Sequence, residues 1–418
     1  MLDRHLTPQI RELLADFRVV TILGARQVGK TTLVRSLAEE LPNCRYQTLD
    51  APAELAAALE DPATFVSDPA ETIIIDEVQR APELLLAIKE RVDRQNRRGQ
   101  FLLTGSADLL NLKRVPDTLP GRNVYTRLFG LSQAEIAGID VRRGESDETL
   151  IDRWFRSDTA SAHEFEPGVA SLLSALATGG FPDAQGRPKR ALQALLDSYV
   201  TASVGREVDE IARVESKDGL RQMLVQIAAR AGGTLNVTEL GRAARVSQHT
   251  AERYTRLLRD MFLIEVLPSW SRNIDQRQTR LPKAYVADSG LHCALLGVDA
   301  AGLDPIREGP TIGSTFECFA INELRKLAAL SINRPNAYHY RNRDGREIDL
   351  ILERGNLDVV AIEIKSGAVV RGSDFRAIDY LSDRIGDQLR AGIVLYTGER
   401  TLSFGGRKAA VPVRALWA

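Results

Sequence analysis

The stretch that most constrains the fold of this chain is residues 24–31, which read GARQVGKT. An apolar run at Val19–Leu23 precedes it, and a segment with helical spacing begins at Lys30. Glycines let backbone N–H groups turn towards phosphate oxygens, a lysine adds charge, and a threonine hydroxyl at a helix start can hold Mg²⁺. The sequence therefore predicts a phosphate-binding loop rather than a chance glycine turn. The residues expected to contact a nucleotide are Gly24, Ala25, Arg26, Gln27, Val28, Gly29, Lys30, Thr31 and Thr32.

A second motif supports this loop. Residues 73–77 read IIIDE, an apolar strand that ends in two acids. In this position Asp76 can support Mg²⁺, and Glu77 can orient or deprotonate an attacking water. Many buried strands end in an acid, so the pair is informative because it follows the glycine loop. We expect Lys30 and Glu77 to be catalytic, and Thr31 and Asp76 to hold the metal.

Two hydroxyls and an arginine extend the predicted site. Residues 101–106, FLLTGS, predict another central strand with Thr104 and Ser106 at its carboxyl end, where open α/β sheets bind ligands. These hydroxyls either sense the γ-phosphate and help to bind the nucleotide, or cap the following turn. Arg122, in LPGR, is predicted to be a catalytic finger or sensor, and the alternative is a solvated surface arginine.

The composition limits the class of protein. The chain has 418 residues, a formal net charge of −1, 44% hydrophobic residues and 27% charged residues, as expected of several folded domains. This balance provides no global attraction to nucleic acid or to membranes. No stretch predicts a membrane span, the N-terminus does not resemble a signal peptide, and the 3 cysteines form no disulfide or metal pattern. We expect a cytoplasmic protein without a membrane partner.

Residues 132–230 are predicted to form a helical lid or connector. Residues 138–167 are rich in charged and small polar residues, which indicates an exposed insertion or a mobile loop. A turn at 178–182, TGGFP, precedes a helical pattern. No chemistry is assigned to this segment. Asp288, further along the chain, is expected to be a structural cap.

Residues 231–309 predict a winged helix. A helix, a turn and a longer helix occupy residues 236–261, and apolar runs at 263–267 and 283–287 can pair as a ribbon. The polar side of the longer helix can contact a DNA duplex, or it can be a solvated or packing face. The arginines of the ribbon loop, 272–280, can also reach a phosphate backbone. The polar side consists of Gln248, His249, Arg253, Arg256 and Arg259.

Residues 310–418 predict a helix, a hairpin and further strands. Period-two geometry places Glu363 and Lys365 on one face of a strand, with Asp349 on the neighbouring strand and Glu317 on the preceding helix. Carboxylates beside a lysine can hold Mg²⁺ and activate water for phosphodiester cleavage, or they can serve binding or structure alone. The predicted metal ligands are Glu317, Asp349 and Glu363, and Lys365 is the predicted catalytic residue.

The motifs GARQVGKTT, IIIDEVQRAP, FLLTGS, LPGR and LFGLSQAE follow one another in the first third of the chain. This combination resembles the bacterial and archaeal AAA-type ATPases that carry a C-terminal domain of formerly unknown function. The resemblance implies an ATP-hydrolysing module of the additional-strand type, with Lys30 and Thr31 on phosphate and Mg²⁺, and Asp76 and Glu77 at the metal and the water. The C-terminal pattern D-x(13)-E-x-K resembles the PD-(D/E)XK nuclease fold, although isoleucine precedes Asp349 where that motif has proline.

These predictions describe an α/β protein with a P-loop AAA-type ATPase core at 1–131, a helical lid or connector at 132–230, a winged helix at 231–309, and a restriction-endonuclease-like α/β domain at 310–418. The leading hypothesis is an ATPase that uses ATP and Mg²⁺ to act on nucleic acid, with DNA favoured and metal-dependent cleavage as an option. An arginine finger would have to reach a neighbour's nucleotide, which favours a homo-oligomer. The alternative is an ATP-switched scaffold whose C-terminal domain binds a protein partner and cuts nothing.

Overall fold

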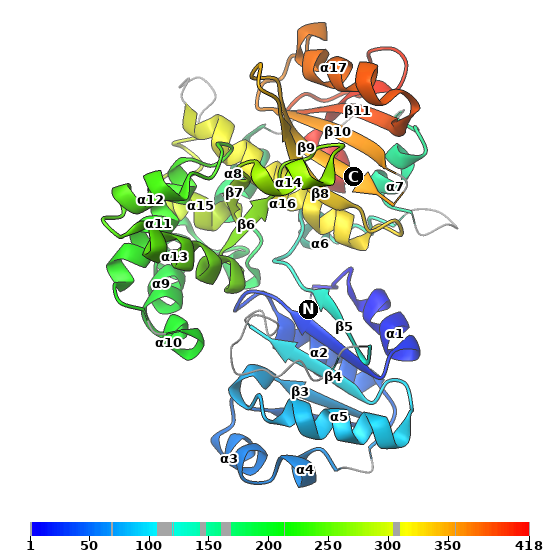
Figure 1. Cartoon of the computed structure of the whole chain (residues 1–418), viewed down its shortest axis with the longest axis vertical. Coiled ribbons are helices and arrows are strands. Elements are labelled where there is room, and N and C mark those ends of the chain that lie inside the picture. Colours follow the sequence, from blue (N-terminus) through cyan, green and yellow to red (C-terminus); the bar gives the residue numbers. More distant parts are fainter. Residues whose placement is uncertain are drawn as a thin grey trace. The chain divides into compact units, whose positions relative to one another are not determined.

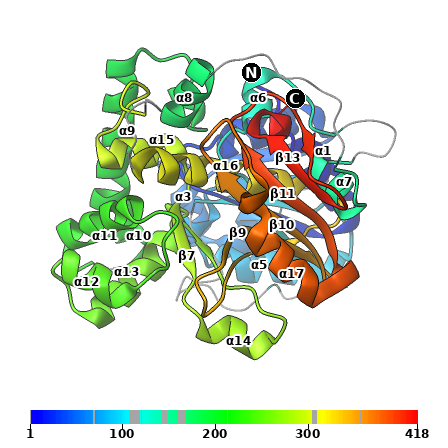
Figure 2. The same cartoon turned by 90° about the horizontal axis from the view of Figure 1, so that it is seen from above.

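A computed structural model of the chain describes residues 2–67, 70–106, 119, 121–142, 148–159, 169–212, 214–303, 310–355 and 357–417. These residues form two compact units (Figure 1, Figure 2). The first unit comprises Met1–Leu131 and Asp260–Phe262, and the second comprises Ser132–Arg259 and Leu263–Ala418. Among the described helices, none combines the length and the apolar character that spanning a bilayer requires.

The first unit is built on a five-stranded parallel sheet with the strand order β2-β3-β4-β1-β5. Every residue of β1, β3 and β4 is buried, because parallel strands are covered on both faces, and this explains their continuous apolar runs. Strand β4 separates the strand before the glycine loop from the strand that ends in two acids, as the additional-strand type requires. The strands are β1 (Val19–Leu23), β2 (Cys44–Thr48), β3 (Thr72–Asp76), β4 (Phe101–Gly105) and β5 (Asn123–Arg127).

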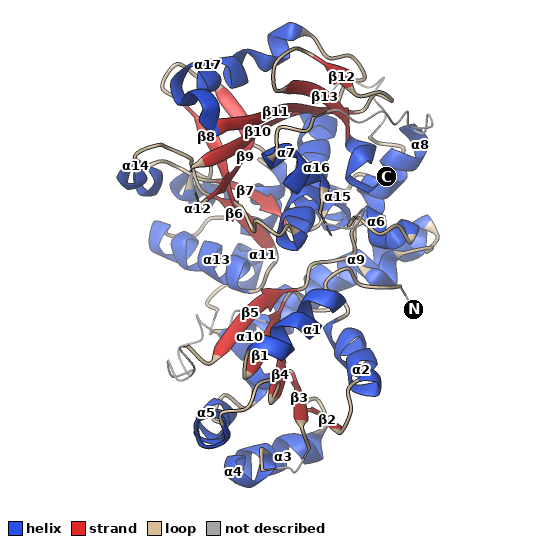
Figure 3. Cartoon of the chain, turned by 90° about the vertical axis from the view of Figure 1, so that its right-hand side faces the viewer, coloured by secondary structure: helices blue, strands red, loops and turns tan. Residues whose placement is uncertain are grey.

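Helices cover both faces of this sheet, with α2 on one face and α5 on the other (Figure 3). Helix α2 begins directly after Gly29, whose φ of 97° is readily adopted only by glycine. Its buried side chains, Leu33, Val34 and Leu37, follow the predicted helical spacing. The helices of this unit are α1 (Thr7–Asp16), α2 (Lys30–Glu40), α3 (Pro52–Glu60), α4 (Pro62–Phe65) and α5 (Leu84–Gln95).

The second unit contains a group of helices in its first half. The expectation of an exposed insertion at 138–167 is wrong for helix α7, because Trp154 and its apolar neighbours are buried, and Thr149 and Asp152 form a capping box. The rest of that segment lies partly outside the described residues. The helices are α6 (Gln133–Ala137), α7 (Leu150–Phe155), α8 (Val169–Thr178), α9 (Lys189–Ala202), α10 (Val208–Ile211), α11 (Lys217–Ala229) and α15 (Ser289–Leu296).

Two helices and an antiparallel ribbon occupy the middle of this unit. Arg245, with φ 56°, turns the chain between α12 and α13. In the ribbon, Ile264 lies opposite Val286, and Leu267 lies opposite Lys283. The elements are α12 (Val237–Ala243), α13 (Gln248–Asp260), β6 (Ile264–Leu267), α14 (Ile274–Thr279) and β7 (Lys283–Val286).

The C-terminal part of the second unit is a six-stranded mixed sheet with the strand order β12-β13-β11-β10-β9-β8. Strand β9 pairs antiparallel with both of its neighbours, β8 and β10. Strand β11 runs parallel to both of its neighbours, β10 and β13. Helix α17 covers one face, and α7 and α16 cover the other (Figure 3). The elements are α16 (Pro310–Leu330), β8 (Asn336–Arg341), β9 (Glu347–Arg354), β10 (Asp358–Lys365), α17 (Arg376–Ile385), β11 (Leu389–Tyr396), β12 (Leu402–Ser403) and β13 (Lys408–Pro412).

The chain that leaves β6 runs along the edge of this sheet. The Trp270 N–H donates to the His339 carbonyl oxygen at 2.6 Å, and the His339 N–H donates to the Pro268 carbonyl oxygen at 2.9 Å. The Trp270 ring joins the apolar core between the sheet and α17, where its centroid lies 6.2 Å from that of Tyr340. The ribbon segment is therefore packed onto the C-terminal sheet.

Candidate nucleotide site and carboxylate cluster

Close backbone approaches shape the glycine loop. A Cβ atom on Gly24 would lie 2.3 Å from the Leu128 carbonyl oxygen, so only glycine fits there. The Lys30 side chain is 3% exposed, and its ammonium donates to the carbonyl oxygens of Gly24 at 3.0 Å and Ala25 at 2.9 Å. The lysine is therefore held against the loop itself. Of the other predicted loop residues, Val28 is buried, Arg26, Gly29 and Thr31 are half-buried, and Gln27 and Thr32 are exposed.

The loop and the acidic strand meet at Asp76. The Thr31 hydroxyl donates to Asp76 Oδ2 at 2.7 Å, and the Thr104 hydroxyl donates to Asp76 Oδ1 at 2.5 Å. Asp76 is fully buried, and a buried carboxylate needs such partners. Because β3 and β4 are parallel neighbours, their carboxyl ends bring Asp76 and Thr104 to the loop.

Glu77 stands beside the loop lysine on a left-handed backbone. Its φ is 60°, a conformation that costs about 1–3 kcal/mol for a residue other than glycine. The Glu77 N–H donates to Thr104 Oγ1 at 2.9 Å, and Glu77 Oε1 lies 4.0 Å from the Lys30 ammonium. The side-chain amide of Gln79 donates to the Glu77 carboxylate and, at 2.8 Å, to Ser106 Oγ. The residues predicted from the sequence thus contribute two carboxylates, an ammonium and three hydroxyls to the site.

This group fits a magnesium-bound nucleotide. Mg²⁺ prefers hard oxygen ligands and shares its coordination shell with phosphate oxygens and water. The Thr31 hydroxyl and the Asp76 carboxylate already lie within hydrogen-bond distance of each other, so both can turn their oxygens to one ion. Lys30 supplies the positive charge that phosphate oxygens require.

Helix α13 presents polar side chains to solvent. Gln248, His249, Arg256 and Arg259 are exposed, as expected for a face that could contact a duplex. Arg253 is half-buried and pairs with Glu215 at 3.2 Å. Four of the five predicted residues are therefore exposed, and Gln248 also donates to Glu252 Oε1 at 3.1 Å.

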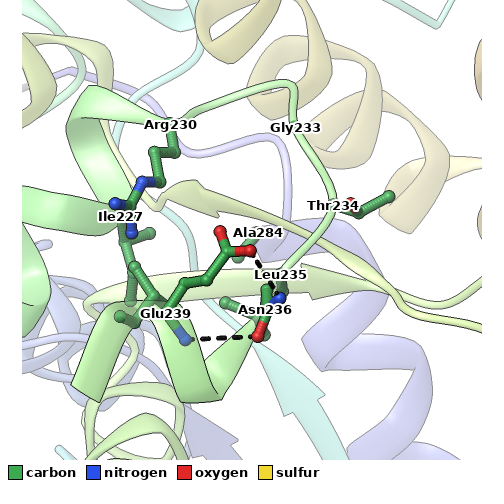
Figure 4. Close-up of a pocket in the computed structure, with 9 residues that line it drawn as sticks. Ile227, Arg230, Gly233, Thr234, Leu235, Asn236, Glu239 and Ala284 are labelled. Atoms are coloured by element: carbon green, nitrogen blue, oxygen red, sulfur yellow. Dashed lines mark hydrogen bonds between the residues drawn. The ribbon is translucent and has the colours of Figure 1, made fainter. Parts of the chain in front are cut away.

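A pocket lies beside α12, lined by residues of α11, the following loop and β7 (Figure 4). Two of its polar side chains, Asn236 and Glu239, bond to each other, with Asn236 Nδ2 donating to Glu239 Oε1 at 2.9 Å. Asn236 Oδ1 also accepts from the Glu239 N–H at 3.2 Å and caps α12. This pair therefore stabilises the helix start rather than forming a ligand site.

The arginine-rich ribbon loop is turned inwards at Arg277. Its guanidinium donates to both oxygens of Glu353, at 2.6 and 2.8 Å, and lies over the rings of Trp270 and Tyr338. Arg277 is 12% exposed and Glu353 is 7% exposed. The expectation that the arginines of this loop reach a phosphate backbone is therefore wrong for Arg277, because a buried bidentate pair already engages it.

A buried lysine lies among the carboxylates near the C-terminal sheet. The Lys283 ammonium is 3.1 Å from Glu317 Oε1, 2.5 Å from Glu347 Oε1 and 3.1 Å from Asp349 Oδ1. Burial opposes the charge of Lys283, but the attraction of Asp349, Glu317 and Glu347 outweighs burial and raises the pKa of the lysine above its usual value. Lys283 is therefore a fixed internal cation.

Asp349 and Glu363 lie just beyond the last backbone pair of β9 with β10, where the two strands diverge. Asp349 Oδ2 accepts from the Ile364 N–H at 2.9 Å. Glu363 Oε1 accepts from Lys365 at 2.7 Å, and Glu363 Oε2 is buried without a hydrogen-bond partner among the described residues. Burial, and then repulsion from Asp349, raises the pKa of Glu363 to about 8.

The predicted metal ligands therefore have two different cations. Lys283 contacts Glu317 and Asp349, whereas Lys365 contacts Glu363. Within the described part of the chain, no three side chains of His, Cys, Asp or Glu lie together so as to hold a metal ion. Glu317 Oε1 and both oxygens of Asp349 already accept hydrogen bonds, so these two carboxylates do not offer those oxygens to a divalent cation.

Asp288 joins two turns that are distant in the sequence. Its carboxylate accepts from the Leu291 N–H at 2.9 Å, which caps α15, and from the Gly180 N–H at 2.6 Å. A Cβ atom on Gly179 would lie 2.2 Å from Asp288 Oδ1. Asp288 is thus a structural cap that also holds the TGGFP turn.

Three family models match the chain. Residues 16–137 match the family described as an AAA domain, residues 170–302 match a domain of unknown function (DUF8612), and residues 312–416 match another domain of unknown function (DUF4143). The first match includes the glycine loop, the acidic strand and all of their contacts described above. The first part of the chain is an AAA-type ATPase domain.

Two mycobacterial proteins are similar over almost the whole chain. Rv2008c of Mycobacterium tuberculosis and Mb2031c of Mycobacterium bovis, both described as uncharacterized, are each 29% identical over 417 residues, which is 98% of this chain and 83% of theirs. The similarity therefore extends from the AAA-type ATPase domain through both domains of unknown function.

Solved structures show a more distant likeness. The Walker-type ATPase of Pyrococcus abyssi is 15% identical, with a TM-score of 0.43, and the match covers 71% of this chain and 96% of that chain. The RuvB Holliday junction branch migration motor of Thermotoga maritima is 19% identical, with a TM-score of 0.30, and the match covers 64% of this chain and 90% of that chain. The assignment of the AAA-type domain rests on the family match.

Sequence reasoning missed three residues of the AAA-type domain. The Tyr46 hydroxyl donates to Asp76 Oδ2 at 3.1 Å, and Arg4 donates to the Val28 carbonyl oxygen at 2.7 Å. Gln79 bridges Glu77 and Ser106, and its position two residues after Glu77 was a usable signal. Arg4 and Tyr46 have no local signal, since only the tertiary fold brings them to the loop.

In the AAA-type domain, Arg122 lies at the end of the sheet opposite to the glycine loop. Its carbonyl oxygen accepts from the N–H of Val19, the first residue of β1, whereas the glycine loop follows the last residue of that strand. The Arg122 guanidinium pairs with Asp93 of α5, with Nη2 donating to Oδ2 at 3.0 Å. The structure therefore does not bring Arg122 to the nucleotide loop of its own chain.

Proposed function

We propose that this chain binds ATP with Mg²⁺ at residues 24–31, hydrolyses it, and uses the energy to act on nucleic acid. One observation supports the hydrolase assignment above all others: the Thr31 hydroxyl bonds to Asp76 beside the Lys30 ammonium and the Glu77 carboxylate. This is the set of groups that phosphoryl transfer to water needs, and it lies within the AAA-type ATPase domain.

Each group has a distinct role in this proposal. Lys30 exchanges the carbonyl oxygens of Gly24 and Ala25 for phosphate oxygens, and Thr31 and Asp76 hold Mg²⁺, which neutralises developing phosphate charge when it is bound. Glu77 orients the attacking water or accepts its proton. The hydroxyls of Thr104 and Ser106 act indirectly, because Thr104 holds Asp76 and Ser106 holds Gln79.

The test of hydrolysis compares the wild-type protein with Lys30→Ala and Glu77→Gln in a phosphate-release assay with and without Mg²⁺. We expect magnesium-dependent turnover in the wild type and its loss in both variants. A Lys30→Ala variant that hydrolyses ATP as fast as the wild type contradicts the assignment.

The nucleic-acid part of the proposal places a winged helix at residues 231–309, with α13 as the helix that contacts a duplex. The exposed positions Gln248, His249, Arg256 and Arg259 support it, because arginines contact phosphates and glutamine can read base edges. With a formal net charge of −1, the chain relies on such a local face for DNA binding.

DNA-stimulated ATP hydrolysis tests this part. We expect duplex DNA to raise the ATPase rate of the wild type and to have little effect on an Arg256→Glu variant. Arg190→Glu, an exposed arginine on α9, is the matched control and should respond like the wild type. No stimulation of the wild type by duplex, branched or single-stranded DNA contradicts nucleic-acid action.

A homo-oligomer follows if Arg122 is a catalytic finger. Because Arg122 lies at the end of its own sheet opposite to the glycine loop, it can only reach a nucleotide bound to another copy. Light scattering of the Glu77→Gln variant with ATP tests this: we expect a larger assembly with ATP than without it, and the Arg122→Ala variant should lose ATPase activity while it still binds ATP.

A second candidate is an ATP-switched scaffold whose C-terminal domain binds a protein partner and cuts nothing. The internal pairing of Arg277 and Lys283 favours it, because these two cations of the ribbon segment are buried against carboxylates and not offered to phosphates. Magnesium-dependent ATPase activity without any response to nucleic acid supports the scaffold over the leading proposal.

A further inference from the structure

The carboxylate cluster at residues 317, 347 and 349 contains a cation that comes from another part of the second unit. We infer that the Lys283 ammonium permanently occupies the place of a divalent cation in this cluster, so that the C-terminal domain has a fixed charge network instead of a metal centre. The inference does not depend on the proposed ATP hydrolysis or nucleic-acid binding, since it concerns different residues.

The number of N–H donors on the Lys283 ammonium equals the number of carboxylates around it. An ammonium has three N–H donors, and Lys283 Nζ has one carboxylate within 3.1 Å for each of them: Glu317, Glu347 and Asp349. The lysine is 1% exposed, so water does not compete for these donors. A buried cation with all of its donors engaged is a part of the fold rather than an exchangeable ligand.

The second oxygen of Asp349 is engaged as well, and Glu317 Oε1 has a second donor. Asp349 Oδ2 accepts from the Ile364 N–H at 2.9 Å, and Glu317 Oε1 also accepts from the Tyr285 hydroxyl at 2.7 Å. The Glu317 Oε2 atom faces Gly232, where an added Cβ atom would lie only 2.5 Å away. Backbone, ring and ammonium thus surround this carboxylate.

A divalent cation would need oxygens that this arrangement does not release. Mg²⁺ requires roughly six oxygen ligands at about 2.1 Å in octahedral geometry. If Glu317 Oε1 and Asp349 Oδ1 turned to a metal ion, they would leave Lys283, and a buried ammonium without its carboxylates is strongly unfavourable. Lys283 and a metal ion therefore exclude each other.

The consequence for the chemistry is specific. In a nuclease, a metal ion lowers the pKa of a bound water and stabilises the charged phosphate transition state. Without a metal ion, no group in this cluster has either role. The charges of the cluster instead connect ribbon strand β7 to strand β9 and helix α16. In this arrangement the cluster is a structural charge network that joins these elements.

Removal of the lysine charge tests the inference in the full-length protein. Lys283→Met keeps much of the side-chain volume and leaves the carboxylates without their cation. We expect its Tm in EDTA to fall by roughly 10 °C, Mn²⁺ to restore part of that loss, and its Mn²⁺ affinity, measured by calorimetry, to exceed that of the wild type by at least about tenfold. The double variant Lys283→Met/Asp349→Asn also lacks the Asp349 carboxylate, and we expect it to show no such Mn²⁺ response.

The wild type and a matched control complete the test. Lys326→Met removes a half-buried lysine, which pairs with Glu323 on α16 away from the cluster, and it should gain no Mn²⁺ response. A wild-type protein that binds Mn²⁺ at a site lost in Asp349→Asn overturns the inference, and this measurement stands even where Lys283→Met fails to fold. A Lys283→Met variant with an unchanged Tm and no gain in Mn²⁺ affinity overturns it as well.

Discussion

Thr31 and Asp76 lie 45 positions apart in the chain and share a hydrogen bond of 2.7 Å. This bond joins the start of helix α2 to the end of strand β3, and both elements flank the place where phosphate is expected to bind. A ligand that engages one of these residues therefore also affects the other, and this pair is the most direct place to perturb the proposed chemistry.

We expect Thr31→Ala to lower magnesium-dependent ATPase activity by about 10- to 100-fold, because it removes both the proposed metal ligand and the partner of Asp76. Thr31→Ser keeps the hydroxyl and should retain most of the activity. Rates measured over a magnesium titration check this expectation. Equal activity of the alanine and serine variants would show that the hydroxyl has no role.

Glu77→Gln should separate nucleotide binding from hydrolysis. The amide cannot accept a proton from water, so single-turnover hydrolysis should fall by about 10²- to 10⁴-fold, while binding of a fluorescent ATP analogue stays near the wild-type level. Gln79→Ala, which removes the partner of Glu77 but leaves the carboxylate, should have a smaller effect. A Glu77→Gln rate close to that of the wild type contradicts the assigned role.

The Arg277–Glu353 pair should be important for stability. Because both side chains are largely buried, Glu353→Gln leaves an uncompensated guanidinium, and we expect the free energy of unfolding to fall by about 3–5 kcal/mol. The exposed pair Arg94–Glu90 is the control, and Glu90→Gln should cost less than about 0.5 kcal/mol. Denaturant unfolding of both variants gives the comparison.

Two glycines with nearly equal φ separate backbone strain from a steric clash. Gly179 has φ 72° and Gly186 has φ 71°, but only a Cβ atom on Gly179 meets another group, the Asp288 carboxylate. We expect Gly186→Ala to cost about 1–2 kcal/mol from strain alone, and Gly179→Ala to cost a further 1–3 kcal/mol or so. Equal destabilisation of the two variants would show that Asp288 moves aside without penalty.

The contribution of His292 to the stability of the second unit should fall in mild acid. His292 is fully buried, and burial lowers its pKa to about 4, compared with about 6.5 in an unfolded chain. Between these values His292 binds more protons in the unfolded state, so its contribution to the free energy of unfolding falls as pH is lowered from about 6.5 to 4, whereas the raised pKa of Glu363 acts in the opposite direction.

The matching variant is His292→Leu. It should remove up to about 1.4 kcal/mol per pH unit from that slope. Urea unfolding at several pH values measures it. His339, whose pKa burial also lowers to about 4, keeps its own contribution in this variant. An unchanged slope would mean that His292 does not titrate with unfolding.

The sequence was most informative where the chemistry is local. The loop from Gly24 to Thr31 and the acids Asp76 and Glu77 each lie in one short segment, and period-two geometry was sufficient to place Glu363 beside Lys365. The rule that neighbouring parallel strands end at the same edge of a sheet predicted that Thr104 lies near Asp76. The sequence did not show whether Thr104 senses phosphate or holds another side chain.

The sequence was least informative where partners are distant. Lys283 lies 34 positions from Glu317 and 66 from Asp349, and in its own segment it looks like an ordinary lysine of an amphipathic ribbon. Arg277 similarly reads as a surface charge until β9 places Glu353 under it. Long-range ion pairs depend on which strand edges meet, and a single sequence does not contain that information.

The placement of Lys283 on the ribbon defines what must be inherited together. A C-terminal domain exchanged between relatives at residue 310 would arrive with the carboxylates of residues 317, 347 and 349 but without the lysine that neutralises them. Recombination at that boundary with a partner that lacks the lysine would therefore produce hybrids that fold poorly, whereas a crossover before β6 would transfer both charges as one piece. Strands β6 and β7 and the C-terminal sheet are therefore best transferred together.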